Sequence, residues 1–283
     1  MEFPIEKMCK VFKVGKSTYY KWRRWLGSAR DNENRMLISE IRRIHENSEA
    51  TYGSPRITQE LKTNGLKVSR PRVARLMKKA NIRAVKPRKF VATTDSKHNY
   101  PVVENKLKRD FTAERKGQVW VSDITYVRTW AGWLYLTVII DLFDRKVVGW
   151  SMSSTLAANQ TVIAAWRMAI KNRTIEENLI FHSDRGVQYA CTAFANILAW
   201  YPHVERSMSR KGDCWDNAVA ESFFKTIKTE LINRSSYKSR EDAAVSIFEW
   251  IETWYNRKRR HSAIGNLTME EFENLLSGQK LAA

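Results

Sequence analysis

The chain has 283 residues, of which 43% are hydrophobic and 28% are charged. This length and composition indicate a folded soluble protein of roughly two domains. The formal net charge of +19 is uneven, because residues 1–110 carry 27 basic and 11 acidic side chains and residues 111–283 carry 22 and 19. The N-terminal excess favours a polyanionic partner over ordinary solvated charge. It favours a membrane surface less, because the basic stretch reads as several short helices rather than one amphipathic helix.

The cysteines and apolar runs argue against secretion and membrane insertion. Cys9, Cys191 and Cys214 are scattered and match neither a zinc site nor a disulfide framework, which fits a reducing cytoplasm. The longest apolar run, residues 134–140, is too short to span a bilayer. The N-terminus has no continuous apolar segment of signal-peptide length. We therefore expect a cytoplasmic protein.

Residues 4–25 are predicted to form two short helices around a turn at Gly15. Pro4 can start the first helix, and Ser17 or Thr18 can cap the second. This segment, within residues 1–28, is a helix-turn-helix candidate, and an ordinary helical hairpin is the alternative.

Residues 29–83 are predicted to form a helix-turn-helix DNA-binding domain. Its first helix spans residues 31–46, and its second starts with Ser54 as N-cap and Pro55 at the first helical position. Gly65 ends that helix, and Ser69 can cap the third. The apolar positions of the first helix are Met36, Leu37, Ile41 and Ile44, and those of the third are Val73, Leu76 and Met77. The basic positions of the third helix, expected to contact DNA unless they are only solvated charge, are Arg72, Arg75, Lys78 and Lys79.

Residues 84–112 read as a basic linker that follows nucleic acid, and the polar stretch continues to residue 116. From residue 117 the pattern changes to strands and helices of an α/β domain around a mixed sheet, with three antiparallel strands first. The predicted strands are residues 119–129, 133–143, 145–153, 179–183 and 203–209. The predicted helices are residues 157–171, 192–200, 214–232 and 240–257. We assign residues 113–233 to the core and 234–283 to a C-terminal helical extension.

Three acidic residues stand out because each lies at the edge or centre of an apolar element. Asp123 lies on a predicted strand, Asp184 at a strand end and Glu221 on a helix. If they converge, their like charges require a cation, and oxygen ligands without His or Cys indicate Mg²⁺ or Mn²⁺. Two such ions can hold a phosphodiester for in-line attack. Taken singly, each acid has a plain alternative: an exposed strand acid, an Asp turn before Gly186, or a helical Glu–Lys pair.

Glu221, Lys225 and Lys228 share one side of their helix, next to its apolar stripe. This spacing predicts that Glu221 binds metal and that both lysines contact DNA phosphates. Asp213 or Asp216 is expected to cap this helix.

Other polar residues near the acids have weaker assignments. Asp141 and Asp144 are assigned to turn chemistry, and His182 to a structural or substrate-neighbouring role. The further residues expected to line the site are Arg185, Gln188 and Tyr189.

Three segments carry a resemblance to a known family: HSDRGVQY, SMSRKGDCWDNAVAESFFKTIKTEL and YNRKRRHSAIGNLTMEEFE. The chain resembles the DDE transposases of bacterial insertion sequences, of the second-open-reading-frame type, in the retroviral-integrase superfamily. The resemblance implies an RNase H-like core in which Asp123, Asp184 and Glu221 form a catalytic triad that binds two Mg²⁺ ions. Thirty-six residues separate Asp184 from Glu221, one more than the family commonly has, and we expect a loop within residues 199–209 to absorb the extra one.

The resemblance implies a transposase that binds the ends of its element, cleaves DNA to give a 3′-hydroxyl and joins that hydroxyl to target DNA. It also implies a homo-oligomer on paired ends, a location at the bacterial nucleoid, and an upstream-frame product as partner or fusion. Two alternatives stay open: a catalytically inactive DNA-binding regulator derived from such an element, and a hydrolytic RNase H-like nuclease.

Overall fold

The computed structural model describes residues 4–24, 28–85, 100–210 and 213–281. The chain divides into two compact units, Met1–Ala84 and Val85–Ala283, and each is described by itself. In the described residues no helix is long and apolar enough to cross a membrane.

The first unit begins with two short helices, α1 (Ile5–Val11) and α2 (Lys16–Arg23). The predicted cap of α2 is wrong. Ser17 and Thr18 lie inside the helix, and the N-cap is Gly15, whose carbonyl accepts the amide of Tyr19 at 3.0 Å. The extended conformation falls at the glycine, so neither hydroxyl occupies the capping position.

Three further helices form the core of the first unit: α3 (Ala29–Asn47), α4 (Ser54–Thr63) and α5 (Arg70–Lys79). Ser28 caps α3, since its Oγ accepts the amide of Asp31 at 3.1 Å. The helices pack through buried side chains of each: Leu37, Ile41 and Ile44, then Ile57 and Leu61, then Val73, Leu76 and Met77.

Two details of these helices differ from the prediction. Met36 is 73% exposed and lies outside the apolar stripe. The N-cap of α4 is Gly53 instead of Ser54, because the extended residue comes one position earlier and Ser54 is already helical. Ser69 does occupy the N-cap of α5, although its side chain makes no capping hydrogen bond.

The second unit is built on a five-stranded sheet in the order β3-β2-β1-β4-β5. β1 pairs antiparallel with β2, as β2 does with β3, whereas β4 runs parallel to both β1 and β5. The strands are β1 (Val119–Thr129), β2 (Gly132–Asp141), β3 (Val147–Ser153), β4 (Leu179–Ser183) and β5 (Val204–Met208). This is an RNase H-like mixed sheet, and the predicted fold class is confirmed.

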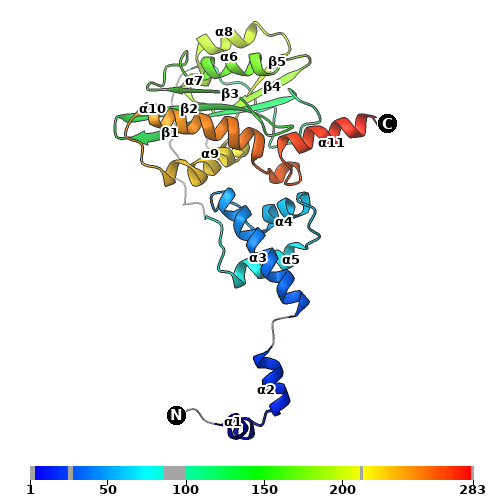
Figure 1. The fold of residues 1–283 in the computed structure, drawn as a ribbon. Helices are drawn as coiled ribbons and strands as arrows, with labels where there is room; N and C mark the ends of the chain where they lie inside the picture. The colour runs from blue at the N-terminus through cyan, green and yellow to red at the C-terminus, as the bar shows by residue number, and fades with distance from the viewer. Residues whose placement is uncertain (1–3, 25–27, 86–99, 211–212, 282–283) are drawn as a thin grey trace. The chain divides into compact units, whose positions relative to one another are not determined.

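Helices cover both faces of the sheet, as Figure 1 shows with α6, α7 and α8 above it and α9 and α10 below. These helices are α6 (Val162–Asn172), α7 (Val187–Ala190), α8 (Thr192–Ala199), α9 (Ala218–Glu230) and α10 (Arg240–Glu249). The upper core is centred on Trp120 and Trp166, and the lower core on Val121, Phe223 and Ile251. Strand residues therefore alternate between the two cores, as the pleat requires.

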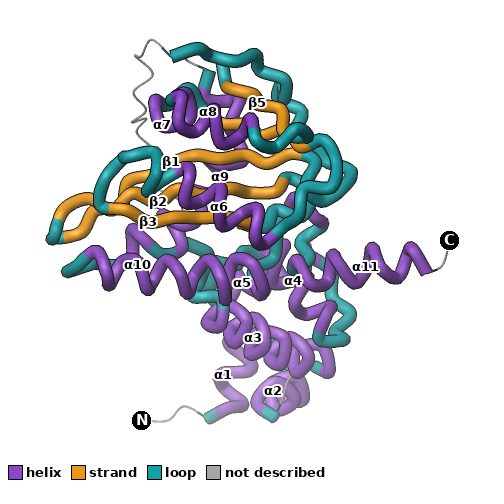
Figure 2. The backbone as a smooth tube through the Cα atoms, turned by 90° about the horizontal axis from the view of Figure 1, so that it is seen from above, coloured by secondary structure: helices purple, strands orange, loops and turns teal. Residues whose placement is uncertain are grey.

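Several predicted helices have other bounds. The first starts at Val162 instead of residue 157, because residues 158–161 form a turn. The predicted helix 214–232 is a 3₁₀ turn, Cys214–Asn217, followed by α9 and a second 3₁₀ turn. The predicted helix 240–257 is α10 continued by a π-helical segment, Trp250–Lys258. A last helix, α11 (Met269–Leu281), follows (Figure 2).

The second half of the predicted linker belongs to the core unit. Leu107 is 4% exposed within the lower core, and the backbone amide of Lys106 donates to Ser207 Oγ at 2.9 Å. Residues 86–99 lie outside the described residues, so the expectation that the linker follows nucleic acid concerns mainly those.

Asp141 and Asp144 do more than form a turn. Asp141 accepts the amide of Phe143, and Asp144 accepts that of Lys146, as expected of turn residues. Both carboxylates are also fully buried and pair with the guanidinium of Arg173. They anchor the end of β2 to the chain that follows α6.

Candidate active site

Strand pairing brings Asp123 and Asp184 together. The parallel register of β1 and β4 pairs Ser122 with Ser183, and the two aspartates are the next residue of each chain. Each carboxylate also accepts a local amide, Asp123 from Ile124 at 2.8 Å and Asp184 from Gly186 at 2.9 Å. The Asp turn before Gly186 therefore exists, and it coexists with the placement beside Asp123.

A pocket of about 190 Å³ opens at these two carboxylates. It is lined by Asp123, Ile124, Tyr126, Leu156, Asp184, Val187, Gln188 and Tyr189. Gln188 and Tyr189, two of the residues expected at the site, are part of its wall. Arg185 lies outside this lining and donates its Nε to the carbonyl of Ser209 at 2.6 Å.

Glu221 lies in the first turn of α9, half-buried and outside the lining of the acid pocket. Its helix is tied directly to the strand of Asp123. Asn217, the N-cap residue of α9, donates its Nδ2 to the carbonyl of Ser122 at 3.1 Å. Ser122 Oγ in turn shares a 2.8 Å hydrogen bond with Tyr189 OH. These bonds join α9, β1 and the pocket wall.

Electrostatics place the three acids in one neighbourhood. Burial raises the pKa of Asp123 well above its usual range, and the charges of Asp184 and then Glu221 raise it further. Burial also raises the pKa of Glu221. Lys228 opposes the rise at Asp123, and burial lowers the pKa of Lys228 itself. The acids thus repel one another, with Lys228 as a nearby positive charge.

The two lysines of α9 differ. Lys228 is half-buried and within electrostatic reach of Asp123, whereas Lys225 is exposed. Among the described residues no ion pair joins Lys225 to Glu221, so the plain helical Glu–Lys pair does not form here.

The loop before α9 is held by Asp216, which does not cap the helix. The Asp216 carboxylate is fully buried and accepts hydrogen bonds from Arg210, Arg109 and Asn105. The bonds from Arg210 come first among the causes that hold the pKa of Asp216 far below its usual range. Asp213 pairs with Arg109 as well. The capping prediction is wrong, because Asp213 precedes the 3₁₀ turn without a side-chain capping bond, Asp216 lies inside that turn, and the N-cap of α9 is Asn217.

The periodicity of apolar residues in the sequence does not indicate the roles of these loop residues. Asn217 and Arg109 act through partners more than 90 positions away in the chain. Only the density of polar residues in SMSRKGDCWDN could have drawn attention to the loop.

His182 is a structural residue. It is fully buried, with Nδ1 at 2.8 Å from Ser207 Oγ and Nε2 at 3.2 Å from Ser209 Oγ. Burial lowers the pKa of His182 to about 4, so the ring is neutral at physiological pH. Its side chain links β4 to β5 two residues before Asp184.

In the first unit, α5 does not present four equivalent cations. Arg72 donates to Glu33 and Asn34 of α3 at 2.8 Å each. Lys79 contributes to the lowered pKa of Asp31, although the main cause there is a hydrogen bond from Ser28. Arg75, Lys78 and Lys79 are exposed, and Arg75 Nε makes a long 3.4 Å bond to the carbonyl of Pro71.

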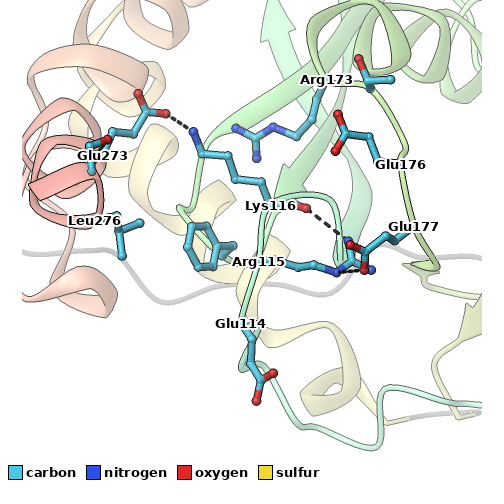
Figure 3. Close-up of a pocket in the computed structure, with 11 residues that line it drawn as sticks. Glu114, Arg115, Lys116, Arg173, Glu176, Glu177, Glu273 and Leu276 are labelled. Atoms are coloured by element: carbon cyan, nitrogen blue, oxygen red, sulfur yellow. Dashed lines mark hydrogen bonds and ion pairs between the residues drawn. The ribbon is translucent and has the colours of Figure 1, made fainter. Parts of the chain in front are cut away.

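A larger cavity, of about 790 Å³, lies between residues 114–116, 173–177 and α11 (Figure 3). Its cations are already paired. Lys116 binds Glu273 at 2.6 Å, Arg115 binds Glu177 at 2.8 Å, and Arg173 binds the buried aspartates described above. The acid pocket, with like charges side by side, is the stronger candidate for catalysis.

The donor chemistry of the acid pocket fits a hard divalent cation. Two carboxylates share one wall, and burial followed by the charge of Asp184 raises the pKa of Asp123; a bound cation would favour the charged form of both acids. In the part of the chain that the structure describes, however, no three Asp, Glu, His or Cys side chains are arranged as a metal-binding group. Asp123 and Asp184 are adjacent, and Glu221 is nearby without completing a three-ligand set.

Comparison with known proteins decides the family. Residues 113–214 and 202–268 match families described as integrase core domain, and residues 31–90 match an HTH-like domain. The transposase InsF of insertion sequence IS3A from Escherichia coli K12 is 42% identical over 275 residues, covering 96% of this chain and 95% of the relative. This chain belongs to the IS3 transposase family. The resemblance carried by the three sequence segments is confirmed.

A second insertion-element protein and one solved structure are also similar to this IS3-family chain. A 31 kDa protein of insertion element IS600 from Shigella sonnei is 41% identical over 265 residues, covering 94% of this chain and 97% of the relative. The catalytic core domain of HTLV-2 integrase, solved in complex with magnesium, is 16% identical with a TM-score of 0.43, covering 57% of this chain and 99% of that domain. That structural similarity is too remote to support a conclusion about function. The family match is a separate finding, and integrase-type core domains as a class generally use divalent metals.

Proposed function

We propose that this IS3-family chain cleaves DNA at the ends of its insertion element and joins the new 3′-hydroxyl to target DNA. The observation that carries the proposal is the pairing of Asp123 with Asp184 at adjacent strand positions, in one pocket and within electrostatic reach of Glu221. Like-charged carboxylates are costly together, and a bound divalent cation would offset that cost.

In this proposal Asp123, Asp184 and Glu221 hold the divalent ions. Two Mg²⁺ or Mn²⁺ ions, when bound, supply charge stabilisation at the attacking and leaving oxygens of a phosphodiester. Glu221, half-buried in the first turn of α9, would have to approach the two aspartates when metal and DNA bind.

The protein's own groups orient the DNA. Lys228 lies near Asp123 and Lys225 is exposed three residues earlier on α9, so both are suited to bind phosphates beside the scissile bond. In the first reaction water attacks phosphorus and the 3′-oxygen leaves as a hydroxyl. In the second, that hydroxyl attacks a target phosphodiester and displaces another 3′-oxygen, with no covalent bond to the enzyme.

The helical unit, residues 29–83, is assigned to the ends of the element. Arg75, Lys78 and Lys79 are exposed on α5, whereas Arg72 binds Glu33 of α3. Such cations bind mainly phosphates and fix register. We further propose that the protein acts in the cytoplasm at the nucleoid, as a homo-oligomer on paired ends, alone or fused to an upstream-frame product.

The test is a strand-joining assay on a labelled duplex copied from the DNA that flanks the gene, in Mg²⁺ and in EDTA. Asp123→Asn, Asp184→Asn and Glu221→Gln should each lower cleavage and joining by at least about 10³-fold, because each removes a negative charge needed to hold the ions. DNA binding, measured by gel shift, should persist in all three.

Retained Mg²⁺-dependent joining in any of the three variants would remove that residue from the triad. Cleavage without joined product would indicate a hydrolytic nuclease. Binding without any Mg²⁺-dependent reaction in the unchanged protein would indicate the catalytically inactive regulator.

A further inference from the structure

An aromatic surface adjoins the acid pocket and has no role in the scheme above. Tyr126 lines the pocket together with Asp123. On the neighbouring strand, Tyr135 lies directly opposite Tyr126, and Trp133 lies opposite Arg128. The ring of Tyr126 contacts both others: it is edge-on to Tyr135 at 5.1 Å and to Trp133 at 6.1 Å between ring centroids.

This surface is open to solvent. Trp133 is 48% exposed, Arg128 is exposed, and both tyrosines are half-buried. Ile124, two residues before Tyr126 on the same face, packs against the upper core, and the joined ends of β1 and β2 reach beyond the helices of that face (Figure 2). The aromatic row therefore begins at the pocket and runs outward along the strand pair.

The strand pair is rigidly supported. At its turn, the amide of Trp130 donates to the carbonyl of Tyr237 at 3.0 Å, and Arg240 Nε donates to the carbonyl of Trp133 at 3.0 Å. The guanidinium of Arg240 also lies 2.8 Å from where a Cβ on Gly132 would stand, at a positive φ of 107° that favours glycine. A braced backbone presents the rings without the entropy cost of ordering a free loop.

We propose that Tyr126, Trp133 and Tyr135 form an aromatic platform on which bases of the DNA strand stack when its phosphate enters the acid pocket. The proposal rests on the proposed function for the identity of the ligand as DNA. Aromatic side chains beside a backbone-binding site stack bases of any sequence, because every base has a π-face. Arg128, exposed on the same face, supplies positive charge for the phosphates of that strand.

A plain alternative is that the rings only stabilise the strand pair, as cross-strand aromatic pairs do. That role would lower the melting temperature on mutation and leave base-dependent binding unchanged. The platform instead predicts a loss that appears only when the ligand has bases.

The experiment compares a labelled twelve-nucleotide oligothymidylate with a twelve-unit strand of abasic residues, binding to the full chain in Mg²⁺ by fluorescence anisotropy. Trp133→Ala should weaken binding of the oligothymidylate about 5- to 100-fold, the range expected for loss of one stacked base. Binding of the abasic strand should not change. Trp133→Phe should restore most of the affinity, and Trp200→Ala, which removes an 84% exposed tryptophan before β5, should have no effect.

A second measurement localises the contact. A duplex with a single-stranded 3′ overhang that carries 5-iodouracil should cross-link on irradiation to Tyr126, Trp133 or Tyr135. Unchanged oligothymidylate affinity in Trp133→Ala, or cross-links confined to other segments, would each overturn the platform. If strand joining fails but base-dependent binding is lost in Trp133→Ala, the proposed function falls and the platform stands. If joining succeeds and Trp133→Ala binds both strands as the unchanged protein does, the platform falls and the proposed function stands.

Discussion

At the scale of single residues, the acid pocket is defined as much by neutral neighbours as by the acids. Ser122 precedes Asp123, and its carbonyl and hydroxyl bind Asn217 and Tyr189. The Oδ1 of Asn217 is buried without a hydrogen-bond partner among the described residues. An unsatisfied buried acceptor costs free energy, which indicates that the position of Asn217 serves the donor bond of its Nδ2 to β1.

Asn217→Ala should slow strand joining about 10- to 100-fold, because the helix that carries Glu221 loses its tie to the strand of Asp123, and small misplacements are costly in catalysis. DNA affinity should stay the same. The measurement is single-turnover joining with binding followed separately.

The matched control is Asn172→Ala, which removes a similar amide bond, Asn172 Nδ2 to the carbonyl of Val148 at 2.9 Å, remote from the acids. Both variants should lose about 1 kcal/mol of folding free energy. Equal effects of the two on joining would show that Asn217 acts through stability alone.

At the scale of elements, the close approach of α6 to the sheet depends on one glycine. A Cβ on Gly149 of β3 would stand 2.3 Å from the carbonyl oxygen of Ala165 and 2.7 Å from Cβ of Ala169. Both are on α6, and the nearest of these atoms belongs to the backbone, so a side-chain rotation cannot relieve the clash. Small residues on both elements set the spacing of this layer.

Gly149→Ala should destabilise the core unit by about 3 kcal/mol, the upper range for overpacking, and chemical denaturation monitored by circular dichroism would measure it. Gly278→Ala is the matched control, since Gly278 lies in α11 with open space around its Cβ position. That change should leave stability equal or raise it by up to about 1 kcal/mol. A Gly149→Ala protein as stable as the unchanged one would mean that α6 shifts freely.

At the scale of the whole molecule, the basic residues are distributed unevenly along the chain. The excess of basic residues lies in residues 1–110, and on α5 one of these, Arg72, is bound to Glu33 of α3. The exposed cations of this helix, Arg70, Arg75, Lys78 and Lys79, can release counterions from DNA. Residues 111–283 carry nearly balanced charge, with 22 basic and 19 acidic side chains, and they include the acids of the pocket.

Lys78→Ala should reduce the slope of log affinity against log salt concentration by about 1, as expected for one lost phosphate contact. Arg43→Ala, which removes a guanidinium paired with Glu40 at 2.7 Å on α3, is the control and should change the slope little. Fluorescence anisotropy with duplex DNA between low and physiological salt gives both slopes. Equal slopes for Lys78→Ala and the unchanged protein would exclude Lys78 as a phosphate contact.

The sequence by itself determined the strands, the mixed sheet and the family, because alternating apolar residues and the three long motifs are local signals. Strand β1 has the predicted bounds, and the local contexts of Asp123, Asp184 and Glu221 were enough to raise the hypothesis of a catalytic triad. Helix ends were less predictable: Gly15 and Gly53 took capping positions expected of hydroxyl residues, since the cap depends on where the backbone turns.

Only the tertiary structure decided which polar residues serve the site. Asp216 was expected to cap a helix and instead binds two arginines, and Asn217 and Tyr189 meet at Ser122. Strand register, which is a property of the folded sheet, sets the two aspartates side by side and leaves Glu221 on a separate helix. Contacts between residues far apart in the chain leave no periodic trace, and so the arrangement of this site became visible only in three dimensions.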